Sequence, residues 1–525
     1  MAFLALIFLG IRFADNKRYS YTHNPSRVSK ELQNKNSSSY RQIMKATSIF
    51  GGVQVFNILI SIARSKVVAV LLGPAGIGVL GLFNSTILLI SSLTNFGLGI
   101  SAVKDIAAAG ETKNEKRIAK VVVVVRRLVW FTGIFGALAT LVLAPWLSEV
   151  AFGNDGYTIA FVWLSITLLL KQLASGEFVI LQGLRKLKEL AKANVVGAAL
   201  GLAASIPLYY YWRLEGIVPA LILTAVFTYI VALYFGAKTK IEKAKVTTAE
   251  LRVEGKSMML MGFMLSLSGI MVLGESYVIR IFINNIGGVE QVGLYNAGIA
   301  LISTYVGLLF TAMETDYYPR LSAVASDNTK SNELVNQQSE IALLILAPVL
   351  IGLLIFIDWV IIILYSSEFV AVDVMIYWAF LGMFFKVPAW VVGFLFIAKG
   401  ESKLFFWSEL VSNLYLLALN LVGYYYWGLT GLGISFLISY ILYLIQVYVI
   451  AKTKYGFSFH RGCIQLFAIQ FGLALICFAI LSLVSAPWIY VVGIPLILLS
   501  ALYSFKELDK RLQLKELLNG YLNKK

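Results

Sequence analysis

The residues in this chain that could take part in chemistry are charged side chains placed inside long apolar segments. A charge at the centre of a lipid bilayer costs roughly 2.5–3.5 kcal/mol or more, so each should face a water-filled cleft or a partner of opposite charge. Basic residues outnumber acidic ones here, and unpaired cations in a medium of low dielectric constant attract phosphate strongly. The set comprises Arg64, Lys66, Lys171, Arg280 and Lys386 on the basic side and Glu177, Glu275 and Glu409 on the acidic side.

Residues suited to covalent or metal chemistry are scarce. The cysteines are Cys463 and Cys477, and the histidines are His23 and His460. Such spacings do not form a metal site or a disulfide framework. No cluster of histidine, aspartate and cysteine suggests nucleophilic catalysis either. We therefore expect a protein that is not an enzyme, with no catalytic residues, no metal and no cofactor.

The composition indicates the elements that must hold these charges. The chain has 525 residues, of which 59% are hydrophobic and only 14% charged, with a mean hydropathy of +0.80. A soluble domain needs a larger polar surface. The formal charge of +16 does not indicate a nucleic-acid partner, because the basic residues lie in short loops between apolar runs and not on one amphipathic face.

Apolar runs of about 20 residues recur along the chain, each long enough to cross a hydrocarbon core of about 30 Å as a helix. The prediction is an all-α polytopic membrane protein with about 14 transmembrane helices. The expected spans are 45–71, 77–103, 121–146, 157–182, 191–212, 216–237, 257–284, 292–318, 340–365, 373–398, 404–427, 430–451, 463–484 and 486–504.

The charges of the loops predict the orientation of these spans. Lys and Arg concentrate in the cytoplasmic loops of membrane proteins. Every second connection is nearly free of them and contains only Arg213, whereas the others are basic, as at 185–188 and 238–245. We expect both termini in the cytoplasm. The tail has apolar residues at helical spacing and is expected to lie on the cytoplasmic interface.

Two pairs of similar stretches reveal an internal repeat. YYYWRLEG at 209–216 matches YYYWGLTG at 424–431, and LGLFNSTILLIS at 80–91 matches VGLYNAGIALIS at 292–303. The offsets are 215 and 212 residues, which is about six spans. An even number of spans preserves orientation, so the halves are parallel repeats of the kind found in transporters. The aromatic runs themselves are expected to anchor span ends at the outer membrane surface.

The repeat divides the chain into two pseudo-symmetric six-helix lobes and a C-terminal helix pair. Such lobes suggest alternating access to a cleft between them. The expected divisions are an N-terminal extension (1–44), an N-lobe (45–237), a cytoplasmic linker (238–256), a C-lobe (257–451), an additional helix pair (452–504) and an amphipathic cytoplasmic tail (505–525).

The repeat also places cations at matching positions in both lobes. Lys66 and Arg280 lie in the outer halves of the first helix of each lobe, where they either line the cleft or extend toward the outer surface. Lys171 and Lys386 lie near mid-depth in the repeat-related spans 4 and 10, too deep for easy extension to the surface. We expect the cleft to hold an anionic group on these cations and on Arg64.

The acidic residues leave alternatives open. Glu275 could form a pair with Arg64 or with another neighbour. Glu177 and Glu409 lie toward the inner ends of their spans and suit a structural role as well as a functional one. All three are candidates for coupling transport to a cation gradient, with the membrane potential acting on a charged head group as the alternative.

Three motifs, in order and with matching spacing, resemble those of the lipid-linked oligosaccharide flippases of O-antigen and enterobacterial common antigen. They are SKVVAVLLGPAGIG at 65–78, which contains Lys66, RIFINNIGGVEQVGLYNA at 280–297, which begins with Arg280, and YYPRLS at 317–322. These flippases belong to the superfamily of multidrug, oligosaccharidyl-lipid and polysaccharide exporters. The N-terminal extension and the last helix pair depart from the twelve helices of many members.

The resemblance implies a cargo and a location. The cargo would be an oligosaccharide on undecaprenyl pyrophosphate, moved from the inner to the outer leaflet of the bacterial cytoplasmic membrane. Other expected partners are membrane lipid and, less directly, a polysaccharide polymerase and chain-length proteins. The alternative is a drug or small-molecule antiporter of the same superfamily, for which the cleft is unusually basic. A membrane glycan polymerase would need a long outward loop, and a scaffold would not need deep charges at symmetric positions.

Overall fold

The structure is a computed structural model that describes residues 27–112, 114–239, 241, 244–484 and 487–512. Within these ranges the chain forms helices and connecting turns, with no strand. The elements are α2 (Arg27–Thr94), α3 (Leu98–Glu111), α4 (Glu115–Val142), α5 (Ala144–Phe152), α6 (Thr158–Gly183), α7 (Leu187–Trp212), η1 (Arg213–Gly216), α8 (Ile217–Ala237), α9 (Thr248–Ile299), η2 (Ala300–Tyr305), α10 (Gly307–Ala323), α11 (Asn328–Leu364), η3 (Ser367–Val372), α12 (Asp373–Ala398), α13 (Ser402–Tyr455), α14 (Arg461–Leu483) and α15 (Trp488–Leu512).

Several of these elements contain two of the expected spans. Nine helical stretches of the described chain, or up to ten if a bent pair counts as one span, are long and apolar enough to cross a membrane. In α2, α9 and α13 a glycine interrupts the helical backbone, at Gly73, Gly288 and Gly428. In α13 the Ser435 hydroxyl donates to the Leu419 carbonyl at 2.6 Å, which requires the two halves to run side by side.

The internal repeat is visible in the backbone itself. Gly73 has φ 63° and ψ −165°, and Gly288 has φ 81° and ψ 173°. Both conformations lie where a side chain would be strained, so glycine is the natural residue at each reversal. The two reversals lie 215 residues apart, which is the offset of the aromatic runs. The repeat deduced from sequence thus corresponds to a repeated turn of the chain.

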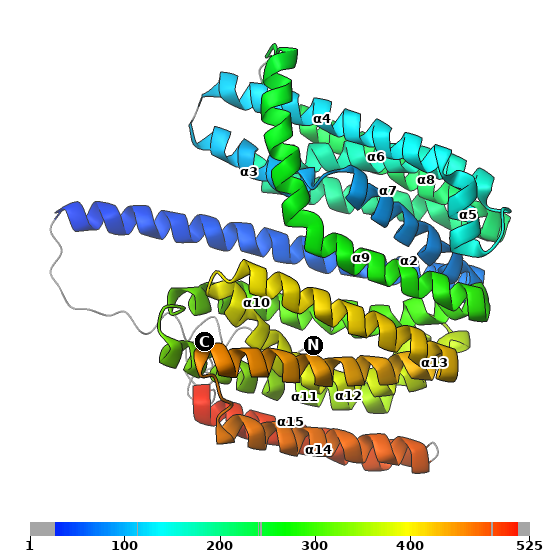
Figure 1. Cartoon of the computed structure of the whole chain (residues 1–525), viewed down its shortest axis with the longest axis vertical. Helices are drawn as coiled ribbons and strands as arrows, with labels where there is room; N and C mark the ends of the chain where they lie inside the picture. Colours follow the sequence, from blue (N-terminus) through cyan, green and yellow to red (C-terminus); the bar gives the residue numbers. More distant parts are fainter. Residues whose placement is uncertain (1–26, 113, 240, 242–243, 485–486, 513–525) are drawn as a thin grey trace, which may run out of the picture.

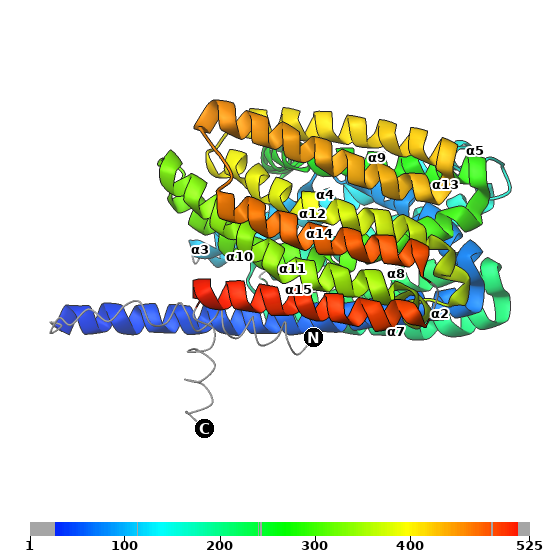
Figure 2. The same ribbon diagram turned by 90° about the horizontal axis from the view of Figure 1, so that it is seen from below.

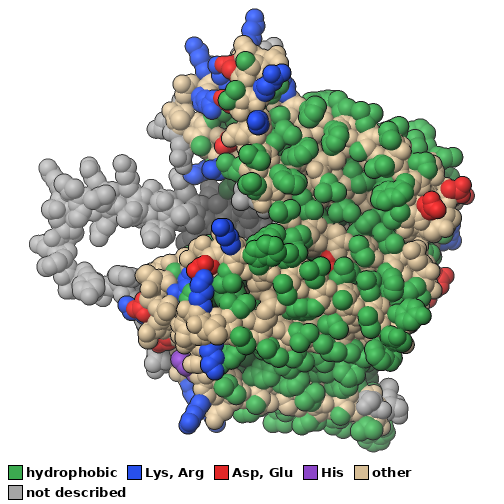
Figure 3. Space-filling model, in the orientation of Figure 1, with side chains coloured by type: hydrophobic (Ala, Val, Ile, Leu, Met, Phe, Trp, Pro, Cys, Tyr) green, Lys and Arg blue, Asp and Glu red, His purple; other side chains and the backbone are tan. Residues whose placement is uncertain are grey.

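The helices form two lobes, as Figure 1 shows, with α2–α8 in one and most of α9–α13 in the other. The last pair, α14 and α15, packs against α11 on the outside of the second lobe (Figures 1 and 2). Figure 3 shows a continuous band of hydrophobic side chains over the body, with charged side chains at its two ends. The predicted fold class is confirmed.

The beginning of α9 departs from the expected linker. The helix starts at Thr248, inside the range 238–256, and Thr247 and Glu250 cap it reciprocally. The segment Thr248–Met264, here called the α9 strap, lies at 56° to Gly269–Ser303. The strap packs on the first lobe, as its ion pair with α4 between Glu250 and Lys120 at 2.8 Å shows. The exact divisions between the lobes remain predictions.

Candidate functional site

Two of the expected cations lie close together in the first lobe. Lys171, on α6, lies within electrostatic range of Arg64, on α2. Both are half-buried, and among the side chains that the structure describes neither forms an ion pair or a hydrogen bond. Two neighbouring cations repel one another in a medium of low dielectric constant. The pair therefore forms a half-buried site with excess positive charge.

Tyr209 gives this site a polar wall. It lies within electrostatic range of Arg64 and is 3% exposed, whereas Tyr210 and Tyr211 of the same run are more than half exposed. The second run repeats the pattern: Tyr424 is 4% exposed and Tyr425 is 65% exposed. The outward-facing rings fit the expected membrane anchor. The first tyrosine of each run turns inward instead, which the sequence reading did not anticipate.

Lys66 connects the two lobes. Its Nζ donates to the carbonyl oxygens of Ile362 at 2.7 Å and Tyr365 at 2.6 Å. Both acceptors lie at the C-terminal end of α11, in the second lobe. Since Lys66 belongs to α2, a residue expected to line the cleft is instead committed to a contact between lobes. Its role in binding the cargo stays a prediction.

Arg280 belongs to the second lobe and lies on the same side of the molecule as Lys66. Its guanidinium donates to Oδ1 of Asn296 at 2.8 Å and to the backbone carbonyl of Ser276 at 2.7 Å. The Asn296 amide in turn donates to the carbonyl of Ile77, in the first lobe, at 3.5 Å. Arg280 therefore stabilises the interface through Asn296, and it is half-buried there. The sequence could have suggested this partner, because Asn296 belongs to the repeated GLYN motif.

Glycines allow the lobes to approach closely at this interface. A Cβ added to Gly78 would lie 1.9 Å from the Val289 carbonyl oxygen, and one added to Gly293 would lie 1.9 Å from that of Pro74. The reversals Gly73 and Gly288 are close by in sequence, so we call this end of the molecule the reversal end. Figure 3 shows that the lobes part toward the opposite end and leave a recess between them.

Lys386 lies in a different environment from Lys171. Its Nζ is 4.9 Å from the ring centre of Tyr440, 5.6 Å from that of Phe436 and 5.8 Å from that of Phe310. Aromatic faces stabilise an ammonium by about 0.5–2 kcal/mol. The structure therefore does not bring Lys386 into contact with the Arg64–Lys171 pair, and within the described side chains it has no ion pair.

The three candidate coupling carboxylates are placed differently. Glu177 accepts two hydrogen bonds from Arg126, at 2.8 and 2.9 Å, and is 6% exposed. Glu409 accepts a hydrogen bond from Tyr443 Oη at 2.5 Å. Glu275 is half-buried, and among the described side chains it pairs with neither Arg64 nor any other base. A coupling role stays a prediction for all three, although the geometry of Glu177 suits a structural one.

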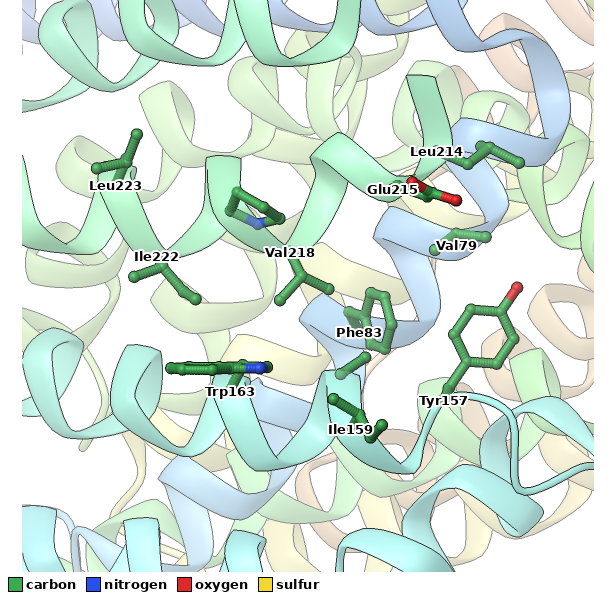
Figure 4. A pocket seen from close by; sticks show the side chains of 12 residues that line it. Val79, Phe83, Tyr157, Ile159, Trp163, Leu214, Glu215, Val218, Ile222 and Leu223 are labelled. Atoms are coloured by element: carbon green, nitrogen blue, oxygen red, sulfur yellow. The ribbon is translucent and has the colours of Figure 1, made fainter. Parts of the chain in front are cut away.

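An apolar groove lies elsewhere on the described part of the first lobe. It has a volume of about 640 Å³ and is formed by α2, α6 and α8 in the first lobe. Figure 4 shows Phe83, Trp163 and Val218 around it, with Glu215 at one side. None of the expected cations lines this groove. It is therefore a feature of the lipid-facing surface and separate from the cation site.

The fold, the band of apolar helices and the deep cations together define a polytopic transporter with two repeated lobes. The model of the family described as "Polysaccharide biosynthesis protein" matches residues 67–373, and the chain belongs to that family. Among relatives of known function, the Lipid III flippases of Escherichia coli (strain K12) and Shigella flexneri are each 24% identical over 390 residues, covering 72% of this chain and 90% of theirs. The resemblance noted in the sequence is confirmed.

Solved structures show the same fold. An inward-facing multidrug transporter of the MATE family aligns with a TM-score of 0.62 at 15% identity, covering 76% of this chain and 94% of its own. The Lipid II flippase MurJ, in an inward closed conformation, aligns with a TM-score of 0.55 at 15% identity, covering 83% and 97%. These alignments show the fold, and the chain is a multi-pass membrane protein.

Proposed function

We propose that this protein is a flippase that moves an oligosaccharide on undecaprenyl pyrophosphate from the inner to the outer leaflet of the bacterial cytoplasmic membrane. The relatives named Lipid III flippase support a lipid-linked glycan as cargo. The observation that carries the proposal is the Arg64–Lys171 pair. It is half-buried among membrane-spanning helices and has no described anionic partner.

A pyrophosphate is the kind of group that such a site would bind. Charge-assisted hydrogen bonds from Arg or Lys to phosphate are roughly twice as strong as neutral ones. A bound dianion would also relieve the repulsion between the two cations. A cationic drug would experience the opposite effect at this site, which disfavours the small-molecule antiporter.

We assign the reversal end to the outer side of the membrane and both termini to the cytoplasm. This follows from the loop charges, because exposed carboxylates such as Glu149, Asp155, Glu215 and Glu368 gather at the reversal end. The recess at the opposite end then faces the cytoplasm, where the cargo is made. In this state the lipid-linked head group could enter from the inner leaflet while its tail stays in the membrane.

The test is transport by the purified protein in liposomes, with a fluorescent lipid-linked oligosaccharide as cargo. Lys171→Ala combined with Lys386→Ala should abolish flipping while the protein remains inserted and monodisperse. Lys452→Ala, which removes an exposed lysine at the end of α13, is the control and should flip normally. Flipping by the double variant at the parent rate would overturn the assignment of these lysines, and no flipping by the parent would overturn the function.

Two single substitutions distinguish the contributions of Lys171 and Lys386 to transport. Lys171→Gln should lower the flipping rate more than Lys386→Gln, because only Lys171 lies next to a second cation in the structure. The reverse order would move the pyrophosphate site into the second lobe. Interaction with a polymerase and chain-length proteins remains a prediction, which co-purification from the native membrane would test.

A further inference from the structure

Lys66 caps a helix that belongs to the other lobe. The last carbonyls of a helix have no partner within it and carry a partial negative charge. α11 ends at Leu364, and the acceptors Ile362 O and Tyr365 O lie on either side of that end. Hydrogen bonds from a charged donor contribute more to stability than bonds between neutral groups. This contact is therefore a substantial part of what keeps the reversal end closed.

Two other described contacts between the lobes at the reversal end are of a different kind. The backbones approach each other at Gly78 and Gly293, and the Asn284 amide donates to the Ala151 carbonyl at 3.1 Å. These contacts involve neutral groups and close packing. Lys66, in contrast, places a full positive charge at the interface. An anionic cargo can therefore compete with the carbonyls of α11 for its ammonium group.

The position of Lys66 also relates it to the proposed cargo site. Lys66 and Arg64 are two residues apart on one helix, a rise of about 3 Å along its axis. Residues with this spacing point to different sides of a helix. Arg64 faces Lys171 within the first lobe, and Lys66 faces α11. A pyrophosphate held by Arg64 and Lys171 would therefore lie at the level of the Lys66 contact.

We propose that Lys66 is a latch on the outer side, which the pyrophosphate of the cargo releases by drawing the ammonium away from the end of α11. The inference rests on the proposed function. A ligand shifts a conformational equilibrium only through different affinities for the two states. Here the cargo gains an ammonium partner only when Lys66 leaves α11, so cargo binding favours the open reversal end. Lys66 is in this sense a positioning residue for transport.

Arg213 provides a matched control. Its guanidinium donates to the carbonyl of Leu71 at 2.8 Å, next to the reversal at Gly73. The chemistry is the same as at Lys66, a cation on a helix-end carbonyl at the reversal end. However, Arg213 and its acceptor Leu71 both belong to the first lobe. Removing this hydrogen bond therefore leaves the contact between the lobes intact.

The experiment measures the separation of the lobes by double electron–electron resonance in lipid nanodiscs. Spin labels are placed at Asp155→Cys and Ala371→Cys, which are exposed in opposite lobes at the reversal end. Cys463 and Cys477 are replaced by Ala in the full chain. Each variant is measured alone and with undecaprenyl pyrophosphate, the lipid carrier without sugar.

Without lipid, Lys66→Gln and Lys66→Met should raise the ratio of long to short distances about tenfold or more over the parent, as expected for the loss of hydrogen bonds from a charged donor. Lys66→Arg should restore the short distance, and Arg213→Gln should match the parent. Undecaprenyl pyrophosphate should lengthen the distance in the parent and add little in Lys66→Gln.

Two results would overturn the proposal in distinguishable ways. If both Lys66→Gln and Lys66→Met keep the distance distribution of the parent, Lys66 is not a latch. If they open but undecaprenyl pyrophosphate leaves the parent closed, the pyrophosphate is not what releases it. The flipping assay then decides the wider question, because a parent that still flips the lipid-linked oligosaccharide loses only the trigger and keeps the proposed function.

Discussion

Arg213 and Gly428 share one backbone conformation, although they lie 215 residues apart and one of them carries a large side chain. Their φ and ψ angles are 50° and −129° for Arg213 and 55° and −139° for Gly428. Each follows the tryptophan of a YYYW run. Glycine adopts this region readily, whereas other residues are strained there by roughly 1–3 kcal/mol. The first lobe therefore contains the strained version of a turn that the second lobe makes without strain.

The first prediction concerns this turn. Arg213→Gly should raise the free energy of unfolding by about 1 kcal/mol, because relief of the strain exceeds the loss of one exposed hydrogen bond to Leu71. Gly428→Ala should lower it by about 1–2 kcal/mol, because the same strain is then introduced in the second lobe. Thermal unfolding in detergent measures both. A loss of stability in Arg213→Gly would show that the guanidinium contact outweighs the strain.

The second prediction concerns Glu177 and Arg126. Arg126→Leu should lower the free energy of unfolding by about 3 kcal/mol, because it leaves a buried carboxylate without its partner. Combining it with Glu177→Leu should recover most of that loss, since no unpaired charge remains. Arg127→Leu, one residue along α4, is the control and removes only a hydrogen bond to Val246.

Transport by the double variant then tests the role of Glu177. If the carboxylate only stabilises the first lobe, Arg126→Leu/Glu177→Leu should flip cargo at nearly the parent rate. A stable double variant without transport would instead favour the coupling role that the sequence left open.

The third prediction concerns the α9 strap. A Cβ at Gly262 would lie 2.4 Å from the Phe96 carbonyl oxygen, so Gly262→Val should push the strap off the first lobe and destabilise the protein by about 1–3 kcal/mol. Gly269→Val is the matched control in the same helix, because a Cβ there meets nothing within 4 Å. Limited proteolysis should cut 238–256 faster only in Gly262→Val. Equal cutting in both variants would contradict the docking of the strap.

The fourth prediction concerns the start of α11, which lies outside the membrane. Asp327 accepts from the backbone N–H groups of Thr329 and Lys330 at 3.0 and 3.1 Å. These hydrogen bonds hold the pKa of Asp327 below its ordinary value of 3.8, and the bond from Lys330 contributes most to this effect. A lowered pKa means that the ionised cap stabilises the fold above pH 3.8 and loses this effect as the pH falls below it.

Asp327→Asn tests this, because asparagine also caps helices but does not titrate in this range. The parent should melt at a higher temperature than Asp327→Asn at neutral pH, and the difference should shrink as the pH is lowered below about 4. A difference that stays constant over that range would show that the carboxylate charge contributes nothing.

Features set by local sequence could be predicted well. The apolar runs fixed the spans, and the matched GLFN and GLYN motifs fixed the period of the repeat. Gly73 and Gly288 then proved to be matched reversals. Such features depend on residues that are neighbours along the chain, so periodicity and composition suffice to find them.

Contacts between distant segments could not be predicted. The partners of Lys66 are backbone carbonyls almost 300 residues away, and a carbonyl has no signature in a sequence. Arg126 on α4 pairs with Glu177 on α6, and nothing in the sequence around either residue indicates the other as its partner. Depth in the membrane follows from sequence, whereas the neighbour at that depth depends on how the helices are packed.

The α9 strap has a consequence for the order of biosynthesis. The surface of the first lobe between α3 and α4 is completed by residues as far as Gly262, which are made after every helix of that lobe. A nascent chain that has emerged only to the end of α8 therefore leaves that surface uncovered in the bilayer. The first lobe is therefore completed only after the ribosome has begun the segment that leads into the second lobe.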